Sequence, residues 1–544
     1  MVTADDILGA CASYENQIRA MTAGNVRDFV AGVDVQVPVV GGRSVRYVNL
    51  DNAATTPPFL PILDCACGFF DWYASVHRGR GFKSQLATHV YEKCRRAVAD
   101  FIGADLSCHA VIFTQNATHA LNKLAARLAP RRDQVVITTL MEHHSNMLPW
   151  RKLGCGLEYA RVRRDDGTLD LADLERTMNR AGTRLCAVTV TGASNVTGVL
   201  PPIRRIARMA HERGALVAVD ATQLVPHRGL RRGDPQGPER ADFAVFSAHK
   251  MHAPFGSGVL VGPRAVFEEG WPDISGGGTV NAVTMDDVFW APPPEKEEAG
   301  TPNLFGAVAL AWAIKAHVTM GMENLAEHER ELTRRALQQL SSIEGLTLYG
   351  PRDPDVREER IGIITLNAER VSHARLAAVL GHEWGIGVRN GCFCAQPYVR
   401  ELLGISDEQM RSVIGNLAAG DHSSVPGMVR VSLGTYNTAE EIDYLAQALR
   451  SILIHRPRAK GGLRPGRRPP GLRRESAHRR PGRLRAHLTR PKAARARRLA
   501  PPTHGPQRIR LGPSARRDGR WQRSAPDGAA SRRAGSSVDR AADF

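Results

Sequence analysis

The chain has 544 residues, which is more than one hydrophobic core usually serves, so we expect at least two domains. Its net charge of +18 is concentrated in residues 456–544, where 24 Arg and 2 Lys stand against 5 Asp or Glu, giving +21 and leaving −3 for residues 1–455. A strongly positive net charge suggests nucleic acid or an anionic membrane as a partner. Residues 1–455 are close to neutral, so this inference applies only to residues 456–544.

The segment 456–544 is rich in Arg, Pro, Gly, Ala and Ser, with few apolar side chains to offset the entropy of ordering, so it is predicted to be disordered. One interpretation is an arm that binds nucleic acid through phosphate attraction alone. The other, which we favour, is a segment without an evolved function. An excess of Arg over Lys is what a GC-rich coding region gives when it is read through or out of frame.

The nine cysteines are odd in number and scattered, unlike the disulfide framework of a small secreted domain. The first residues lack the basic stretch followed by an apolar one that marks a secretory signal. No uncharged apolar run approaches the roughly 20 residues that span a bilayer. We therefore expect a soluble, cytoplasmic protein in a reducing setting, without a membrane partner.

Between residues 110 and 262, short apolar stretches alternate with helix-like ones, a pattern typical of a largely parallel sheet flanked by helices. The short stretches are rich in Val, Ile and Ala and apolar on both faces, as buried parallel strands are. Strands are predicted at 110–114, 134–140, 184–191, 215–219, 241–247 and 258–262. Helices are predicted at 117–128 and 202–213, and another is predicted to begin near Asn303.

After about residue 325 the pattern changes to long charged helices and shorter strands, which indicates a second, smaller α+β domain ending near His455. The predicted fold class is therefore α/β, with a mostly parallel sheet in the larger domain. Four parts are predicted: an N-terminal segment (1–45) that packs with the smaller domain, a large domain (46–320), the smaller domain (321–455) and the tail (456–544).

Polar residues follow five consecutive predicted strands. Ligands of open α/β sheets bind beyond the carboxyl ends of the strands, so these side chains are expected to share one site. Any one group is compatible with an ordinary loop, but five groups at one edge indicate binding. They are Asn116 and Thr118, then Glu142, His143 and His144, then Ser194 and Asn195, then Asp220 and Gln223, and finally Ser247, His249 and Lys250.

Lys250 by itself is more readily a lysine at the rim of a sheet, but a desolvated lysine is also the side chain that forms Schiff bases with aldehydes. A cofactor with an aldehyde, a phosphate and a protonatable ring nitrogen, such as pyridoxal phosphate, accounts for the whole set. Lys250 would hold the aldehyde, and Asp220 would pair with the ring nitrogen and keep it protonated. Gln223 would contact the ring hydroxyl, and His143 would stack on the ring face. The phosphate would be bound by Thr118, Ser247 and His249, and the N-terminus of the predicted helix 117–128 also favours an anion there.

Two adjacent histidines, His143 and His144, also suggest a metal site. No third ligand lies at a recognisable spacing, so we predict no metal.

Five segments resemble those of the class V aminotransferase superfamily, in its cysteine desulfurase and selenocysteine lyase branch. The segments are 47–57, 142–150, 220–223, 247–250 and 299–303, in the order of the family. The resemblance covers residues from about 45 to 450 and implies a fold type I, pyridoxal phosphate-dependent homodimer with active sites at the subunit interface. It implies that Lys250 is the Schiff-base lysine, Asp220 the ring-nitrogen partner, His143 the stacking residue, and Thr301 a phosphate contact from the neighbouring subunit. We also assign Asn116 and Ala117 to the cofactor site, and Asn195 to both the cofactor and the substrate site.

The stretch Gly387–Pro397 is similar to that of cysteine desulfurases of the second group. By this resemblance Arg389 holds the substrate carboxylate, Cys394 becomes a persulfide, and Arg430 is another substrate-binding arginine. The chemistry is reasonable, because a guanidinium pairs with a carboxylate through two hydrogen bonds and a thiolate is well able to attack sulfur. The expected reaction is removal of sulfur from L-cysteine with release of L-alanine, and a sulfur-acceptor protein is a further expected partner.

Three departures from the family pattern keep other interpretations open. Cys392 stands where the family often has histidine, and the Cys392–Cys394 pair would form a disulfide, share the sulfur or bind metal. Gln115, Asn116 and His119 depart from the phosphate-loop motif, and the 35 residues between Cys394 and Arg430 are more than that group has.

Two alternative functions therefore remain. One is a transaminase, epimerase or lyase of the same fold that acts on a different amino acid, with Cys394 incidental or an inert buried thiol. The other is a non-catalytic sulfur carrier or scaffold, or a nucleic-acid-binding protein that depends on the tail.

Overall fold

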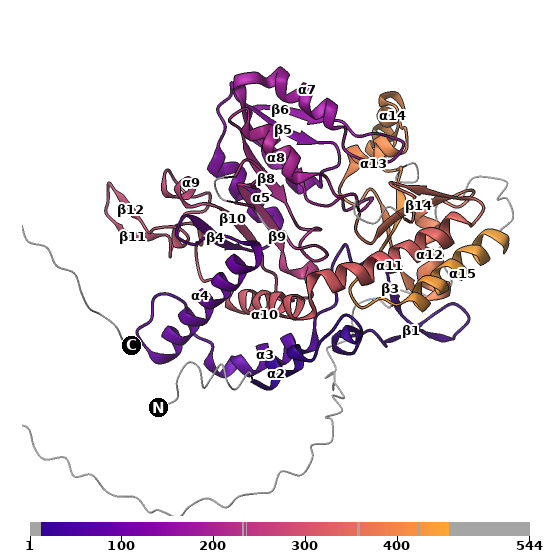
Figure 1. The fold of residues 1–544 in the computed structure, drawn as a ribbon, viewed down its shortest axis with the longest axis horizontal. Coiled ribbons are helices and arrows are strands. Elements are labelled where there is room, and N and C mark those ends of the chain that lie inside the picture. The colour runs from indigo at the N-terminus through magenta and orange to yellow at the C-terminus, as the bar shows by residue number, and fades with distance from the viewer. Residues whose placement is uncertain (1–11, 231–232, 235–236, 356–359, 422–424, 456–544) are drawn as a thin grey trace, which may run out of the picture. The chain divides into compact units, whose positions relative to one another are not determined.

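The computed structural model describes residues 12–230, 233–234, 237–355, 360–421 and 425–455 (Figure 1). The basic segment 456–544, predicted to be disordered and considered as a nucleic-acid-binding arm, lies outside the described residues. The eight cysteines described, from Cys65 to Cys394, are all free thiols.

A seven-stranded sheet forms the larger part of the fold, in the order β4-β10-β9-β8-β7-β5-β6. Only β10 runs antiparallel to its neighbours, so the prediction of an α/β fold with a mostly parallel sheet is confirmed. The strands are β4 (His109–Thr114), β5 (Val135–Thr139), β6 (Gly156–Ala160), β7 (Leu185–Thr191), β8 (Leu216–Asp220), β9 (Phe243–Ser247) and β10 (Gly258–Pro263). The sequence did not predict β6, an edge strand that is mostly half-buried and so lacks the continuous apolar run of its neighbours.

Helices cover both faces of this sheet because its strands are apolar on both faces. Val217 and Val219 of β8 pack in one core cluster with α8, while Ala218 between them packs in another with α5. On the first face α4 and α10 pack against each other, as Figure 1 also shows. The helices of this part are α4 (Phe82–Ile102), α5 (Ala117–Leu128), α6 (Leu148–Lys152), α7 (Leu171–Ala181), α8 (Ile203–His211), α9 (Arg264–Glu268) and α10 (Leu304–Met320), and the hairpin β11 (Val280–Val283) and β12 (Val288–Trp290) adjoins them in sequence.

A four-stranded antiparallel sheet follows, in the order β13-β14-β17-β16, with its own core cluster. In the register of this sheet Arg389 of β16 lies directly opposite Arg430 of β17. Its strands are β13 (Leu346–Tyr349), β14 (Ile363–Ala368), β16 (Arg389–Gly391) and β17 (Met428–Ser432), and its helices are α11 (Met322–Ser341), α12 (His373–Trp384), α13 (Gln396–Leu402), α14 (Asp407–Ala418) and α15 (Ala439–His455).

The N-terminal residues contact both parts of the fold. The hairpin of β1 (Gln36–Pro38) and β2 (Ser44–Arg46) is tied to the smaller part, because the Val40 backbone N–H donates to the His382 carbonyl. The next strand, β3 (Val48–Asn49), pairs with β15 (Ile386–Gly387). Helix α2 (Ala12–Arg19) packs instead on α3 (Leu60–Phe69) and α10, because Ile18 is buried in the larger core. This helix does not follow the prediction that residues 1–45 pack with the smaller domain.

Among the described residues no single helix is long and apolar enough to cross a bilayer. The pair α10 and α11 meets that length and composition only across a bend of 76°. Most of α10 is buried within the larger core, against α4, α3 and α2.

A buried ion pair joins α4 to the segment that precedes Thr301. Both terminal nitrogens of the Arg95 guanidinium contact the Glu298 carboxylate, at 2.7 and 3.1 Å, and the side chains are only 3% and 6% exposed. Glu298 also accepts from the Phe113 backbone N–H of β4 and from the Tyr91 hydroxyl. Both oxygens of this carboxylate are therefore paired. Its removal would leave the buried Arg95 guanidinium with Glu92, which is 43% exposed, as its counter-charge.

We predict that Glu298→Ala lowers the free energy of unfolding by about 3–5 kcal/mol, the usual cost of removing one partner of a buried ion pair. Urea denaturation of the full chain measures this change. The matched control is Asp133→Ala, which breaks an ion pair whose side chains are 73% and 70% exposed and should leave stability unchanged. Equal effects of the two substitutions would contradict the prediction.

Candidate active site

One cavity of 420 Å³ lies at the carboxyl ends of the parallel strands and reaches β16 and β17 of the smaller sheet. Thirteen of the predicted site residues line it: Asn116, Ala117, Thr118, His143, Asn195, Asp220, Gln223, Ser247, His249, Lys250, Arg389, Cys394 and Arg430. Glu142, His144 and Ser194, which were expected to share this site, do not line it. Thr301 is exposed and does not line the cavity of its own chain. The cavity therefore gathers side chains from both sheets, and their roles stay predictions.

Lys250 ends a short 3-10 helix, Ala248–Lys250, directly after β9. Burial, and then the positive charge of Arg430, lower the pKa of its amine from 10.5 to about 8, although Asp220 and Cys394 act in the opposite direction. A fraction of this lysine is thus neutral near pH 7, which is the form that can act as a nucleophile or base.

His143 lies beside Lys250 and Asp220 at the end of β5. Burial lowers the pKa of its imidazole to about 4, and the Asp220 carboxylate opposes this shift while Lys250 adds to it. The Ser145 backbone N–H donates to His143 Nδ1 at 3.1 Å, which leaves a proton on Nε2 of the neutral ring. Asp220 is itself buried, and its Oδ1 accepts from the Thr222 backbone N–H.

The N-terminus of α5 forms one wall of the cavity. Its cap is Asn116, whose side chain accepts from the His119 backbone N–H, and the Ala117 N–H donates to Ser247 Oγ at 2.8 Å. The first residue of β10 passes so close that a Cβ on Gly258 would lie 2.4 Å from the Asn116 carbonyl carbon, so only glycine fits there. A helix N-terminus with hydroxyl groups of Thr118 and Ser247 beside it can bind an anion such as phosphate.

Two arginines form the opposite wall of the cavity, and both pair with Asp51. Arg430 is 4% exposed, and one of its nitrogens lies 3.1 Å from Asp51 Oδ1. Arg389 is 51% exposed and lies 3.0 Å from Asp51 Oδ2. Arg430 also donates to the Asn195 carbonyl and lies over the Phe393 ring, with 5.0 Å between the guanidinium carbon and the ring centre.

Cys394 is exposed to the cavity on a strained loop. Phe393 and Cys394 both have positive φ angles, 52° and 56°, which non-glycine residues rarely adopt. Two hydrogen bonds of 2.7 Å hold this conformation: Asn195 Nδ2 donates to the Phe393 carbonyl, and the His144 N–H donates to the Cys394 carbonyl. Cys392 does not line the cavity, and its thiol donates to the Pro426 carbonyl at 3.0 Å.

A fully buried carboxyl group, that of Glu142, supports the wall that carries His143. It accepts from Thr139 Oγ1, Asn146 Nδ2 and the Thr191 backbone N–H, so it joins the ends of β5 and β7. Burial raises its pKa to about 8, although these three donors oppose the shift.

The sequence did not identify the roles of Asp51, Glu142 and Phe393. All three fall within stretches that carry the family resemblance. Their place in those stretches was the sequence feature that could have pointed to a role. The arginine partners of Asp51 and Phe393 and the Thr191 partner of Glu142 are distant in the chain, and no spacing rule indicates such pairs. Among the described residues no group of three His, Cys, Asp or Glu side chains is arranged to hold a metal ion.

Residues 48–445 match the family model described as aminotransferase class-V. The chain belongs to this family. A probable cysteine desulfurase of Halalkalibacterium halodurans is 36% identical over 411 residues, which are 74% of this chain and 92% of that protein. The cysteine desulfurase of Haloferax volcanii is 34% identical over 74% of this chain and 88% of its own length. The apo structure of a cysteine desulfurase from Thermococcus onnurineus NA1 superposes with a TM-score of 0.68 at 30% identity, covering 80% of this chain and 98% of that one.

The lowered pKa of Lys250 predicts how its reaction with an aldehyde depends on pH. Below about pH 8 most of the amine is protonated and only a minor fraction reacts, so labelling rises as the pH passes through about 8 rather than 10.5. Reductive labelling of cofactor-free protein with an aldehyde and borohydride, followed by peptide mass spectrometry, gives the midpoint at Lys250. The Lys250→Arg protein is the control, and a midpoint above pH 10 would contradict the expectation.

Proposed function

We propose that this chain is a pyridoxal phosphate-dependent cysteine desulfurase, which takes sulfur from L-cysteine as a persulfide on Cys394 and releases L-alanine. The observation that carries the proposal is that a lysine, a thiol and two arginines line one cavity. The names of the relatives support the choice of cysteine as substrate.

The residues present fit pyridoxal phosphate. The cavity offers an acid for a ring nitrogen, an amine for an aldehyde and a helix N-terminus for a phosphate, supplied by Asp220, Lys250 and α5. In addition, Gln223 Oε1 is buried and has no hydrogen-bond partner among the described residues, as expected of a group waiting for a ligand hydroxyl. When bound, the cofactor would withdraw electrons from the α-carbon of the substrate.

The chain's own residues would supply the remaining steps. Arg389 and Arg430 would hold the substrate carboxylate. Lys250 Nζ, neutral at a pH above about 8, would accept the proton of the α-carbon. Cys394 Sγ would then bond to the substrate sulfur as the Cβ–S bond of the substrate breaks. The carbon product becomes alanine when Cβ takes up the proton given up by the Cys394 thiol and Lys250 Nζ returns its proton to the α-carbon, and the sulfur stays on Cys394 as a persulfide.

Cys394→Ala should lower the turnover of L-cysteine at least about 100-fold, because no other thiol lines the described cavity. Alanine and sulfide are measured with a reductant present, and mass spectrometry locates the extra sulfur on the Cys394 peptide. The matched control is Cys67→Ala, at an exposed thiol of α3 outside the cavity. Unchanged turnover in Cys394→Ala would exclude the persulfide step.

We further propose that the chain acts as a homodimer in which Thr301 reaches the phosphate site of the partner. An aromatic cluster surrounds Phe305, which is four residues after Thr301 in the sequence. Phe70, Tyr73 and Phe255 lie around Phe305, with ring centres 4.6 to 6.3 Å from it. Three of these side chains are 47–60% exposed, and an exposed aromatic patch is typical of an interface.

Mixing two inactive variants tests the shared site. Lys250→Ala and Thr301→Ala homodimers should each have low activity, whereas a hybrid dimer has one site with both residues intact. Co-refolding of the two variants should therefore restore up to about a quarter of the wild-type activity, since half the dimers are hybrid and each has one good site. No recovery, or a monomer in sedimentation analysis, would contradict the proposal.

A further inference from the structure

Asp51 acts as a built-in anion for both arginines of the cavity. Its two oxygens lie 3.1 Å from Arg430 and 3.0 Å from Arg389, although Asp51 itself does not line the cavity. Burial lowers the pKa of Arg430 and the Asp51 carboxylate opposes this shift. The three groups together carry a net charge of +1, because one carboxylate stands against two guanidinium groups.

The position of Asp51 is fixed by the backbone around it. The Asp51 N–H donates to the Asn49 side chain, and Asp51 forms an isolated parallel bridge with Ser432, two residues beyond Arg430. The neighbouring residue Asn52 donates to the Ser432 carbonyl, and Ser432 Oγ accepts from the Ala53 N–H. Asp51 is thus attached to the same strand that carries Arg430.

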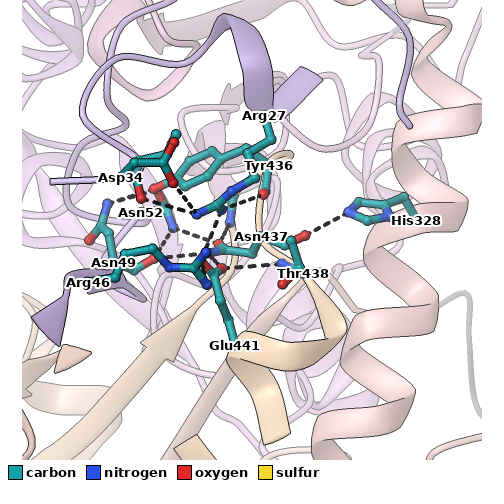
Figure 2. A network of polar contacts seen from close by, with 12 residues as sticks. Arg27, Asp34, Arg46, Asn49, Asn52, His328, Tyr436, Asn437, Thr438 and Glu441 are labelled. Atoms are coloured by element: carbon teal, nitrogen blue, oxygen red, sulfur yellow. Dashed lines mark hydrogen bonds and ion pairs between the residues drawn. The ribbon is translucent and has the colours of Figure 1, made fainter. Parts of the chain in front are cut away.

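A polar network behind Asp51 holds this attachment in place (Figure 2). The Tyr436 hydroxyl donates to Asn52 Oδ1 and accepts from Asn49 Nδ2. Asn437 bonds to Asn52 and to the buried carboxylate of Glu441. Figure 2 also shows Arg27 and Arg46 beside Glu441, and the Arg27–Glu441 contact is 2.9 Å. The network therefore ties Asp51 to both the N-terminal segment and α15.

One guanidinium nitrogen of Arg430 has no hydrogen-bond partner among the described residues. This nitrogen, Nε, is buried, while the other two nitrogens contact Asn195 and Asp51. Arg389 is half exposed to the cavity. The two arginines can therefore bind an incoming carboxylate. Because their net charge together with Asp51 is +1, they can neutralise only one carboxylate group.

We propose that Asp51 is a positioning and specificity residue, which orients Arg389 and Arg430 and reduces their charge so that the cavity accepts a monocarboxylate and discriminates against a dicarboxylate. This inference rests on the proposed function for its view of the arginines as the substrate-carboxylate site. It adds the reason why one carboxylate is preferred, since a second would find no positive charge left to pair with.

Calorimetry with two small anions tests this role. Propionate has one carboxylate and malonate has two that can bridge the arginines. Each is titrated into full-length protein loaded with pyridoxal phosphate, so that the phosphate region is filled, at constant ionic strength. Asp51→Asn should raise the affinity for malonate relative to propionate on the order of tenfold, because two guanidinium groups then lack their counter-charge. Asp51→Glu, which keeps the charge, should retain the wild-type ratio.

A second variant keeps the test decisive if Asp51→Asn fails to fold. Arg389 is half exposed, so Arg389→Gln should fold, and it leaves Asp51 and Arg430 with no net charge. Propionate affinity should then fall about tenfold or more. An unchanged anion ratio in folded Asp51→Asn, or an unchanged propionate affinity in Arg389→Gln, would overturn the inference.

Neither titration requires L-cysteine or turnover. A protein that binds the anions as expected but releases no alanine would therefore refute the desulfurase proposal alone. If the chain takes up no pyridoxal phosphate, the same ratios are measured on the cofactor-free protein.

Discussion

The buried hydrogen bonds to the Glu142 carboxyl group are the interaction on which the cavity depends. They join the end of β5 to the end of β7 through Thr139, Asn146 and the Thr191 N–H. A buried donor without an acceptor costs about 1–3 kcal/mol, so these three donors strongly favour one arrangement of the two strand ends. His143 follows Glu142 directly, and the position of the ring follows from this anchor.

Desolvation then divides the cavity into two regions of different charge. Burial lowers the pKa values of His143 and His249 to about 4 and that of Lys250 to about 8, so the histidines are neutral at pH 7. Positive charge remains at Arg389 and Arg430, on the opposite wall. One wall of the cavity thus holds neutral imidazoles and an amine that loses its proton more readily than an ordinary lysine, while the arginine side stays positive where a carboxylate would bind.

Much of the larger sheet could be predicted because each of its inner strands is a short run of Val, Ile and Ala. The set of polar residues beyond these strands could also be predicted, since parallel strands deliver their ends to one edge. The antiparallel direction of β10 could not be predicted, because the apolar pattern of a buried strand is the same whichever way the strand runs. Asp51 was not assigned a role, since its two arginine partners are brought to it only by the pairing of the smaller sheet and the network of Tyr436 and Asn437.

The two positive φ angles at Phe393 and Cys394 have a consequence for how sulfur would leave the cavity. Each such conformation costs about 1–3 kcal/mol, and that energy is returned when the loop moves away. That energy would offset part of the cost of breaking the two hydrogen bonds that hold the loop. A sulfur atom on Cys394 would then leave the cavity through a movement of only a few residues.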